Sequence, residues 1–128
     1  MIEVSNLSFA YNTEKILDDI SFKGSGGQLI ALLGSNGAGK STLFKCLMGF
    51  LKNYEGTIKL GGEDIRNLSR RQMAALAAYI PQSETPVFNY TVFDSVLMGT
   101  TGMLSPFSSP GPAQTATARE AMGYLGIG

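Results

Sequence analysis

The nine residues from Gly34 to Thr42 read "GSNGAGKST" and fit the pattern G-x-x-x-x-G-K-[ST]. A short apolar run, "LIALL" at 29–33, precedes them, and "LFKCLMGF" at 43–50 follows with apolar residues at helical spacing. A strand, a glycine loop and a helix in this order distinguish a phosphate-binding loop from a chance match in a glycine-rich chain. The other glycine cluster, "GSGG" at 24–27, precedes a strand and has no lysine after it, which predicts a plain turn.

The residue types in this loop have the chemistry that a phosphate needs. Its glycines, at 34, 37 and 39, permit positive φ and a close approach of the backbone to a ligand. Successive N–H groups can then turn toward the anion, and the following helix adds its unpaired N–H groups and its dipole. We expect Lys40 to lie at the β- and γ-phosphates, Ser41 to bind Mg²⁺ and Thr42 to donate to a phosphate oxygen. The predicted contact residues are Gly34, Ser35, Asn36, Gly37, Ala38, Gly39, Lys40, Ser41 and Thr42.

Composition narrows the classes of protein that fit. The chain has 128 residues, enough for one domain, and its 10 basic and 10 acidic residues give no net charge, which argues against nucleic-acid binding. Cys46 is the one cysteine, so no internal disulfide forms, and we expect it to be a packing residue. The absence of histidine excludes imidazole bases and histidine metal ligands. No signal peptide is visible, and no run approaches the ~18 apolar residues of a membrane span.

The periodicity predicts alternating strands and helices. Strands are expected at 2–11, 16–24, 29–33, 56–60 and 77–82, with the third buried on both faces of a parallel sheet. A helix is expected over 40–51, with Leu43, Leu47 and Phe50 in the core. A second helix opens with a capping box of Ser69 and Gln72.

The last third of the chain predicts two more helices. One follows Thr91 as its N-cap and ends with Gly99 at the C′ position. Residues 100–115, rich in Gly, Ser, Thr and Pro, predict a loop. A final helix is expected over 113–126, with Ala118, Met122 and Leu125 on one side.

The stretch "GSNGAGKSTL" at 34–43 resembles the Walker A loop of the ATP-binding subunits of ABC transporters, including its Asn36. Upstream, Tyr11 in "FAYNTEKILDDISF" is similar to the family's A-loop, whose aromatic ring stacks on adenine. Downstream, "YIPQ" ending at Gln82 is similar to the Q-loop, whose glutamine reaches Mg²⁺ and faces the membrane subunit. The alternatives are a strand-end aromatic that packs on the core for Tyr11 and a loop amide that bonds to backbone groups for Gln82.

The resemblance implies an α/β fold: a P-loop NTPase core with an N-terminal antiparallel β subdomain, truncated before the helical signature region is complete. Residues 1–128 would be the N-terminal part of one ABC ATPase domain. ATP and Mg²⁺ are the implied cofactors. The implied partners are a transmembrane permease and a second ATP-binding subunit, at the cytoplasmic face of the cell membrane. Residues 96–128 look like importers of the iron–siderophore, haem or cobalamin type.

Several motifs of that family are missing from the 128 residues. There is no "LSGGQ" signature, no later apolar strand that ends in Asp-Glu, and no switch histidine. Phosphoryl transfer depends on an oriented water and on placed charges. We therefore expect a fragment that binds MgATP, contains no complete catalytic set, and leaves apolar sheet edges unpaired. The alternative is a fragment of a soluble, non-transport ABC ATPase that acts on DNA or ribosomes.

Overall fold

The computed structural model describes residues 1–82, 89–104 and 108–127. The chain divides into two compact units, Met1–Tyr79 and Ile80–Gly128, and each is described here by itself. The first unit contains a sheet, the glycine loop and two α-helices, and the second contains two α-helices. The fold is therefore α/β, as the sequence predicts.

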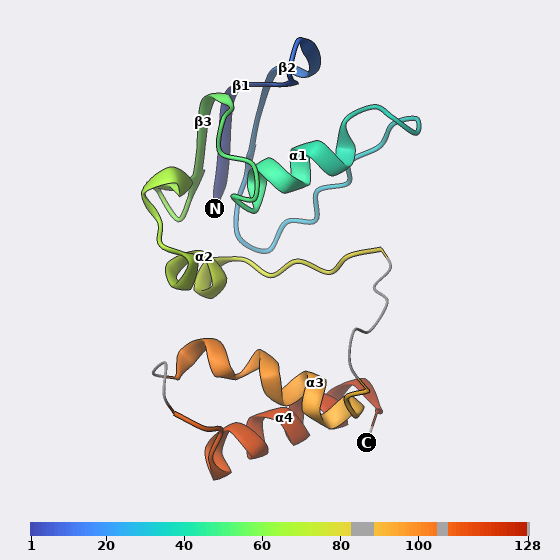
Figure 1. The fold of residues 1–128 in the computed structure, drawn as a ribbon, viewed down its shortest axis with the longest axis vertical. Helices are drawn as coiled ribbons and strands as arrows, with labels where there is room; N and C mark the ends of the chain where they lie inside the picture. Colours follow the sequence, from blue (N-terminus) through green and yellow to red (C-terminus); the bar gives the residue numbers. More distant parts are fainter. Residues whose placement is uncertain (83–88, 105–107, 128) are drawn as a thin grey trace. The chain divides into compact units, whose positions relative to one another are not determined.

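A four-stranded antiparallel sheet forms the centre of the first unit (Figure 1). Its strands are β1 (Ile2–Tyr11), β2 (Glu14–Gly24), β3 (Glu55–Leu60) and β4 (Glu63–Asp64), in the order β2-β1-β3-β4. Because β1 is central and pairs with both β2 and β3, the predicted N-terminal antiparallel β subdomain is confirmed.

A bulge in β1 determines which side chains face the core. Strict alternation from Val4 would place Asn6 inward and Leu7 outward. Instead the register shifts between Val4 and Leu7, and Asn6 takes a φ of 51°. Its side-chain amide donates to Asp19 Oδ1 at 2.7 Å, and Asp19 on β2 also has a positive φ, 51°. The paired irregularities return Leu7 to the buried face, where its side chain is fully buried.

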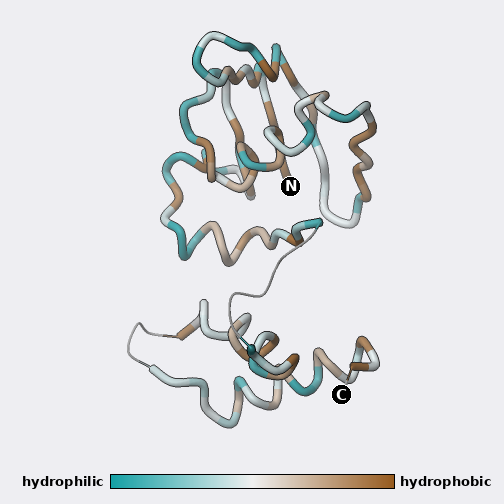
Figure 2. The backbone as a smooth tube through the Cα atoms, turned by 45° about the vertical axis from the view of Figure 1, so that its right-hand side comes forward, coloured by the Kyte–Doolittle hydropathy of each residue, from teal (hydrophilic) through white to brown (hydrophobic). Residues whose placement is uncertain are grey.

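The helix α1 (Lys40–Leu47) contributes Leu43 and Cys46 to the buried core that lies against the sheet. Figure 2 shows hydrophobic stretches interleaved with polar ones along the strands. Cys46 is fully buried, as expected of a packing residue. The core consists of Val4, Leu7, Phe9, Leu17, Leu43, Cys46, Tyr54, Ile58, Ile65 and Leu68.

The predicted strand at 29–33 is wrong. Those residues form an irregular segment between β2 and α1 (Figure 1), and Leu29 and Leu33 are 97% and 89% exposed. The predicted strand at 77–82 is likewise irregular. A strand is stable only when its backbone groups pair with a neighbour. Among the described residues the four paired strands form one antiparallel sheet, and none of them pairs with either segment.

The remaining helices of the first unit follow local signals in the sequence. The helix α2 (Arg70–Leu76) opens with the predicted capping box, in which Ser69 accepts from the Gln72 N–H, and a 3₁₀ turn, η1 (Ile65–Asn67), precedes it. By contrast, α1 stops at Leu47 instead of at 51, because Gly49 takes a φ of 69°. Phe50 therefore lies beyond the helix and is 65% exposed, so the prediction that it belongs to the core is wrong.

The second unit is built on α3 (Val92–Gly99) and α4 (Pro112–Leu125), with a 3₁₀ turn, η2 (Thr101–Met103), after α3. Thr91 is the N-cap of α3 as predicted, but Gly99 is its last helical residue and not C′, because Thr100 continues in the right-handed region. Gly126, with a φ of 68°, ends α4. On α4, Ala118 is buried whereas Leu125 is 69% exposed.

The predicted loop at 100–115 contains η2 and the first turn of α4, and its residues 105–107 lie outside the described part of the chain. Across 1–82, 89–104 and 108–127, no helix has the length and apolar character that crossing a bilayer requires.

Candidate nucleotide-binding site

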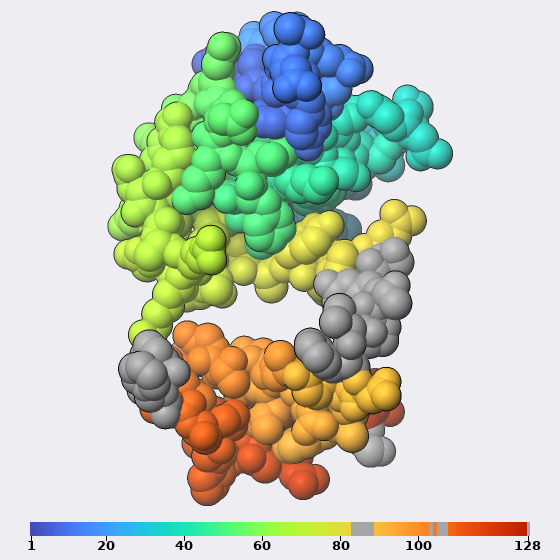
Figure 3. Space-filling view, in the orientation of Figure 1, coloured from blue at the N-terminus to red at the C-terminus, as the bar shows by residue number. Residues whose placement is uncertain are grey.

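The loop before α1 is a tight, solvent-exposed turn. Residues 34–38 are exposed, and the blue-green region that contains them projects from the edge of the first unit (Figure 3). Gly37 and Gly39 take φ values of 84° and 82°, so two of the three glycines adopt the left-handed conformation that the pattern predicts. Gly34 has no positive φ; it lies close to Ala38 instead, since a Cβ on Gly34 would lie 3.3 Å from the Ala38 Cβ.

Close packing against β2 requires a glycine at position 39. A Cβ there would lie 3.0 Å from both the Ile16 carbonyl oxygen and the Leu17 Cδ2. Gly39 is also the N-cap of α1, and its carbonyl accepts the first helical hydrogen bond, from Leu43 N, at 2.8 Å. The start of α1 is therefore fixed against the first half of β2, which positions the loop relative to the sheet.

The N-terminus of α1 presents donors without a side-chain acceptor. Gly39 provides no side-chain cap, and the first turn contains no acidic residue. The first N–H groups of a helix lack partners within the helix, and together with the dipole they attract an anion. Ser41 is exposed at this end, whereas Thr42 is buried, with 9% of its surface accessible. The exposed hydroxyl of Ser41 suits a ligand in solvent, and the hydroxyl of Thr42 lies deeper.

Lys40 closes the loop with its own side chain. Its Nζ donates to the carbonyl oxygens of Gly34 at 2.7 Å and of Ser35 at 2.6 Å. A further backbone bond, from Ala38 N to Ser35 O at 3.3 Å, tightens the turn. The Lys40 ammonium group thus lies against the first residues of the loop, close in sequence to the N–H groups at the start of α1. A full positive charge and several backbone donors are therefore concentrated in one short segment, which is the donor set that a polyphosphate requires.

Tyr11 lies at the end of β1, on the same strand as the buried Phe9. The two rings meet edge to face, with centroids 4.8 Å apart and planes at 85°. Tyr11 is nevertheless 43% exposed, so part of its ring is available to a ligand. It pairs with Glu14 across the hairpin, and Ile16, which contacts Gly39, lies two residues further on, about 7 Å along the strand. The hairpin therefore connects Tyr11 directly to the strand that supports the glycine loop.

Gln82 is an exposed residue in a bend at the start of the second unit. Residues 83–88, which follow it, lie outside the described part of the chain. Its Q-loop role stays a prediction, since the glycine loop belongs to the other unit. No cluster of three or more acidic or cysteine side chains that could hold a metal ion occurs in the described ranges. A magnesium ion at this site would rely on hydroxyl, amide, water and phosphate oxygens, which are ligands that it commonly takes.

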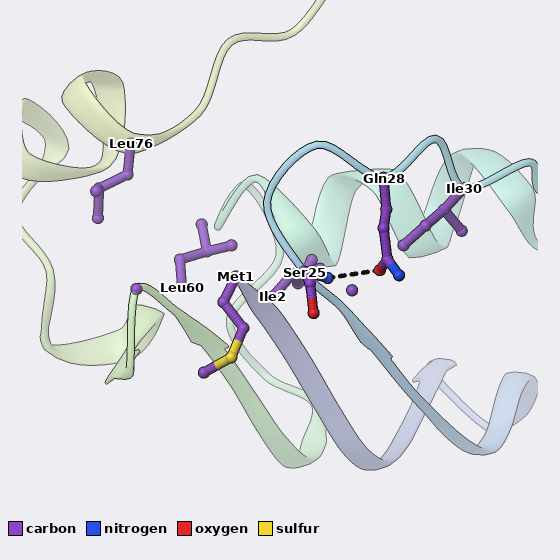
Figure 4. Close-up of a pocket in the computed structure, with 9 residues that line it drawn as sticks. Met1, Ile2, Ser25, Gln28, Ile30, Leu60 and Leu76 are labelled. Carbon is purple, nitrogen blue, oxygen red and sulfur yellow. Dashed lines mark hydrogen bonds between the residues drawn. The ribbon is translucent and has the colours of Figure 1, made fainter.

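A pocket of about 250 Å³ lies apart from the glycine loop, and sequence reasoning did not find it (Figure 4). Within it, the Ser25 N–H donates to Gln28 Oε1 at 2.7 Å, the dashed line in the figure. Its wall contains both apolar side chains and polar groups. The wall is formed by residues of the sheet, of the segment after β2, and of α2. The lining residues are Met1, Ile2, Gly24, Ser25, Gln28, Ile30, Leu60, Gly61 and Leu76. No pattern in the sequence indicates it, because its walls are distant along the chain.

Proteins of known sequence resemble the chain over most of its length. Over 86% of its length the chain is 46% identical to the probable iron chelatin transport ATP-binding protein of Helicobacter pylori, covering 44% of that protein. Over 99% of its length it is 35% identical to the hemin import ATP-binding protein of Rhizobium etli, covering 48% of it. The chain therefore spans about half the length of the curated relatives that it matches.

Solved structures resemble the chain as well. A nucleotide-free ATP-binding cassette from an ABC transporter superposes with a TM-score of 0.81 over 99% of this chain and 54% of that one, at 24% identity. An ATP-binding subunit of an ABC transporter superposes with a TM-score of 0.66 over 83% of this chain and 44% of that one, at 30% identity. The ABC transporter family model matches residues 17–128, which include the glycine loop and all of α1 to α4. The chain belongs to the ABC transporter family, in its ATP-binding part.

Proposed function

We propose that residues 34–42 bind MgATP, and that the chain acts as the ATP-binding part of an importer. The observation that carries this proposal is the geometry of the loop: an uncapped helix N-terminus beside the Lys40 ammonium, with left-handed glycines at 37 and 39. Bound MgATP would supply the phosphoanhydride bond that an importer hydrolyses. Lys40 and the N–H groups would hold the phosphates, and the Ser41 hydroxyl would contribute to the magnesium site.

We assign the adenine to Tyr11. The edge-to-face contact with Phe9 fixes the orientation of its ring, and the residue is 43% exposed. A flat aromatic face offers stacking area to a base without requiring a specific hydrogen bond. Because β2 connects the hairpin to Gly39, the ring and the loop lie on one continuous support. Gln82 is assigned to the magnesium site from its place in the sequence alone.

The relatives suggest which transport class this is. The proteins of Helicobacter pylori and Rhizobium etli carry names that refer to iron chelatin transport and hemin import. We propose that this chain serves an importer of the same class, at the cytoplasmic face of the membrane. Its partners would be a transmembrane permease and a second ATP-binding subunit. The neutral net charge supports this class over an ABC ATPase that acts on nucleic acid.

We propose that the 128 residues, as the N-terminal part of one ABC ATPase domain, bind MgATP without efficient hydrolysis. Their sequence contains no signature motif, no Asp-Glu strand end and no histidine, so nothing in it would orient an attacking water. Lys40 and Ser41 would provide binding and part of the charge stabilisation.

Binding of MgATP to the Lys40→Ala variant, measured by isothermal titration, tests the proposal. The change removes the charge that closes the loop, and we expect binding to weaken by about two orders of magnitude, since a charge-assisted contact to phosphate contributes up to about 3 kcal/mol. Lys45→Ala is the matched control, because Lys45 is an exposed lysine in the last turn of the same helix. Equal binding by both variants would contradict the assignment of the loop. Turnover of about 1 s⁻¹ or more by the wild-type chain would contradict the absence of efficient hydrolysis.

A further inference from the structure

The glycine loop contains an asparagine followed by a glycine, a pair in which the asparagine side chain can lose ammonia. Asn36 is followed by Gly37, and it is the chain's only asparagine with a glycine after it. Asparagine side chains are among the thermolabile groups of proteins. The loss of ammonia begins when the following main-chain nitrogen approaches the side-chain carbonyl carbon, and a glycine obstructs that approach least. The other asparagines precede leucine, threonine or tyrosine; they are Asn6, Asn12, Asn53, Asn67 and Asn89.

The structure leaves both reacting groups accessible. Asn36 and Gly37 form an exposed turn, and a Cβ on Gly37 would meet nothing within 4 Å. Among residues 1–82, 89–104 and 108–127, none forms a hydrogen bond with the Asn36 side chain or with the Gly37 N–H. The next amide differs, because Ala38 N donates to Ser35 O at 3.3 Å. The Gly37 nitrogen, which would react, is thus not restrained by a hydrogen bond within the loop.

We propose that Asn36 is a site of spontaneous deamidation that inactivates the nucleotide loop. The Gly37 nitrogen attacks the Asn36 Cγ, a new N–C bond forms, and the Cγ–Nδ2 bond breaks. The side-chain amino group leaves with the proton of the Gly37 amide as ammonia. Water then adds across either C–N bond of the succinimide, its hydroxyl going to the carbon and its proton to the nitrogen. The products are aspartate and isoaspartate, and no oxidation or reduction occurs.

The change alters the loop in two ways that oppose an anion. Either product places a carboxylate where Asn36 was neutral, and this charge repels phosphates and attracts Lys40. Isoaspartate also routes the main chain through the side-chain carbon, which lengthens the backbone before Gly37. Because the donors of the loop are backbone N–H groups, that extra atom displaces them from one another.

The consequence for nucleotide binding rests on the proposed function. If the loop wraps the phosphates of MgATP, the Gly37 N–H becomes a hydrogen-bond donor to an oxygen and no longer approaches Asn36. Bound nucleotide therefore protects Asn36, whereas Asn36 in an empty loop deamidates. The extent of deamidation at Asn36 would therefore increase with the time that the site has spent without ligand.

Ageing of the whole 128-residue chain at mildly alkaline pH, with and without MgATP, tests the chemistry. Peptide mass spectrometry follows the tryptic peptide 24–40, in which Asn36 is the only asparagine. The internal control is Asn12, which is also exposed in a turn but precedes the β-branched Thr13. We expect conversion at Asn36 to be faster than at Asn12 by at least about tenfold, because glycine leaves the attack open and threonine hinders it. Equal rates, or conversion at Asn36 only in denaturant, would overturn the proposal.

Anion exchange then separates the deamidated fraction from the unmodified fraction of the same aged sample, and the binding of MgATP to each is measured. We expect the deamidated fraction to bind at least about tenfold more weakly, which corresponds to about 1.4 kcal/mol. Equal binding by both fractions would overturn the claim of inactivation while leaving the proposed function intact. If the unmodified fraction does not bind, the proposed function fails, whereas the mass measurement still decides whether Asn36 reacts. The Asn36→Asp variant reproduces the aspartate product directly and is expected to bind as weakly as the deamidated fraction.

Discussion

The two units of the chain are stabilised in different ways. In the first unit, Leu7 on β1 and Ile58 on β3 are fully buried, and these two paired strands lie far apart in the sequence. Among the described residues of the second unit, Ala118 is the one buried hydrophobic side chain, and α3 and α4 rely on caps at their ends. Long-range burial contributes several kcal/mol per residue, whereas a cap contributes about 1 kcal/mol. The glycine loop therefore lies on the unit with the larger hydrophobic core.

The largest effect is expected from Leu7→Ala. Leu7 is fully buried in the centre of β1, so the change leaves a cavity and should lower the free energy of unfolding by about 2–5 kcal/mol. Urea denaturation followed by circular dichroism measures it. Leu125→Ala in α4 is the matched control, since Leu125 is 69% exposed and should change stability by less than about 0.5 kcal/mol. Similar losses in the two variants would remove the distinction between the units.

A close contact between β3 and the bulge of β1 gives the next effect. Gly56 has a φ of 86°, and a Cβ there would clash with the carbonyl oxygens of Ser5 and Asn6. We expect Gly56→Ala to cost about 2–4 kcal/mol, from the left-handed conformation plus the clash. Gly62→Ala is the control, because Gly62 has a φ of 94° with nothing within 4 Å of its Cβ, and should cost about 1–2 kcal/mol. Thermal unfolding compares the two, and equal losses would mean that the clash adds nothing.

In the second unit, the capping box of α3 can be removed by Thr91→Ala. The Thr91 Oγ1 accepts from the Asp94 N–H at 3.1 Å and donates to Asp94 Oδ2 at 2.6 Å. Its loss should destabilise α3 by about 1 kcal/mol, seen as faster amide hydrogen exchange in α3 while β1 is unchanged. Thr117→Ala, an exposed mid-helix change in α4, should leave that exchange as it is. Faster exchange in β1 as well would show that the two units are not independent.

The smallest effect concerns pH. The Arg66 guanidinium, 2.7 Å from Asp64 Oδ2, lowers the pKa of Asp64 below its ordinary value of 3.8. A carboxylate whose pKa is lower in the folded chain stabilises the fold above its unfolded pKa, and this contribution is lost as the pH falls through the folded value. Asp64→Asn, which keeps an oxygen that can accept from the Arg66 N–H, should therefore be less stable than wild type at neutral pH. The gap in urea midpoint should narrow as the pH falls below 3.8 and close once it is below the folded pKa of Asp64, and a gap that does not narrow would contradict the ion pair.

Local signals in the sequence predicted much of the fold. The capping residues Ser69 and Thr91 were predicted correctly, because a cap depends on residues within one turn. The strand at 29–33 was not, although its composition is the most apolar in the chain. An apolar run becomes a strand only beside a partner, and the partner is not encoded within the run. Similarly, Phe50 keeps the helical spacing of the core but lies beyond the turn at Gly49.

The candidate site shows the same division between local and long-range information. The left-handed conformations of Gly37 and Gly39 follow from the motif, since no other residue type adopts them as readily. The contact of Gly39 with Ile16, and hence the position of the loop on β2, depends on packing between residues that are distant in sequence. The motif therefore predicts the left-handed glycines of the loop but not the packing on β2 that holds the loop in place.

The hydrogen bonds from Lys40 to the carbonyl oxygens of Gly34 and Ser35 make ligand entry a substitution reaction. A phosphate that binds the Lys40 ammonium must replace its hydrogen bonds to those two carbonyl oxygens, which then bind water. Because each new hydrogen bond replaces an old one, the net gain per bond is near 1 kcal/mol. A ligand with one phosphate gains little in such an exchange, whereas a chain of three phosphates can recruit the ammonium and the helix N–H groups together. If the loop binds phosphates as proposed, it would discriminate by their number as well as by their presence.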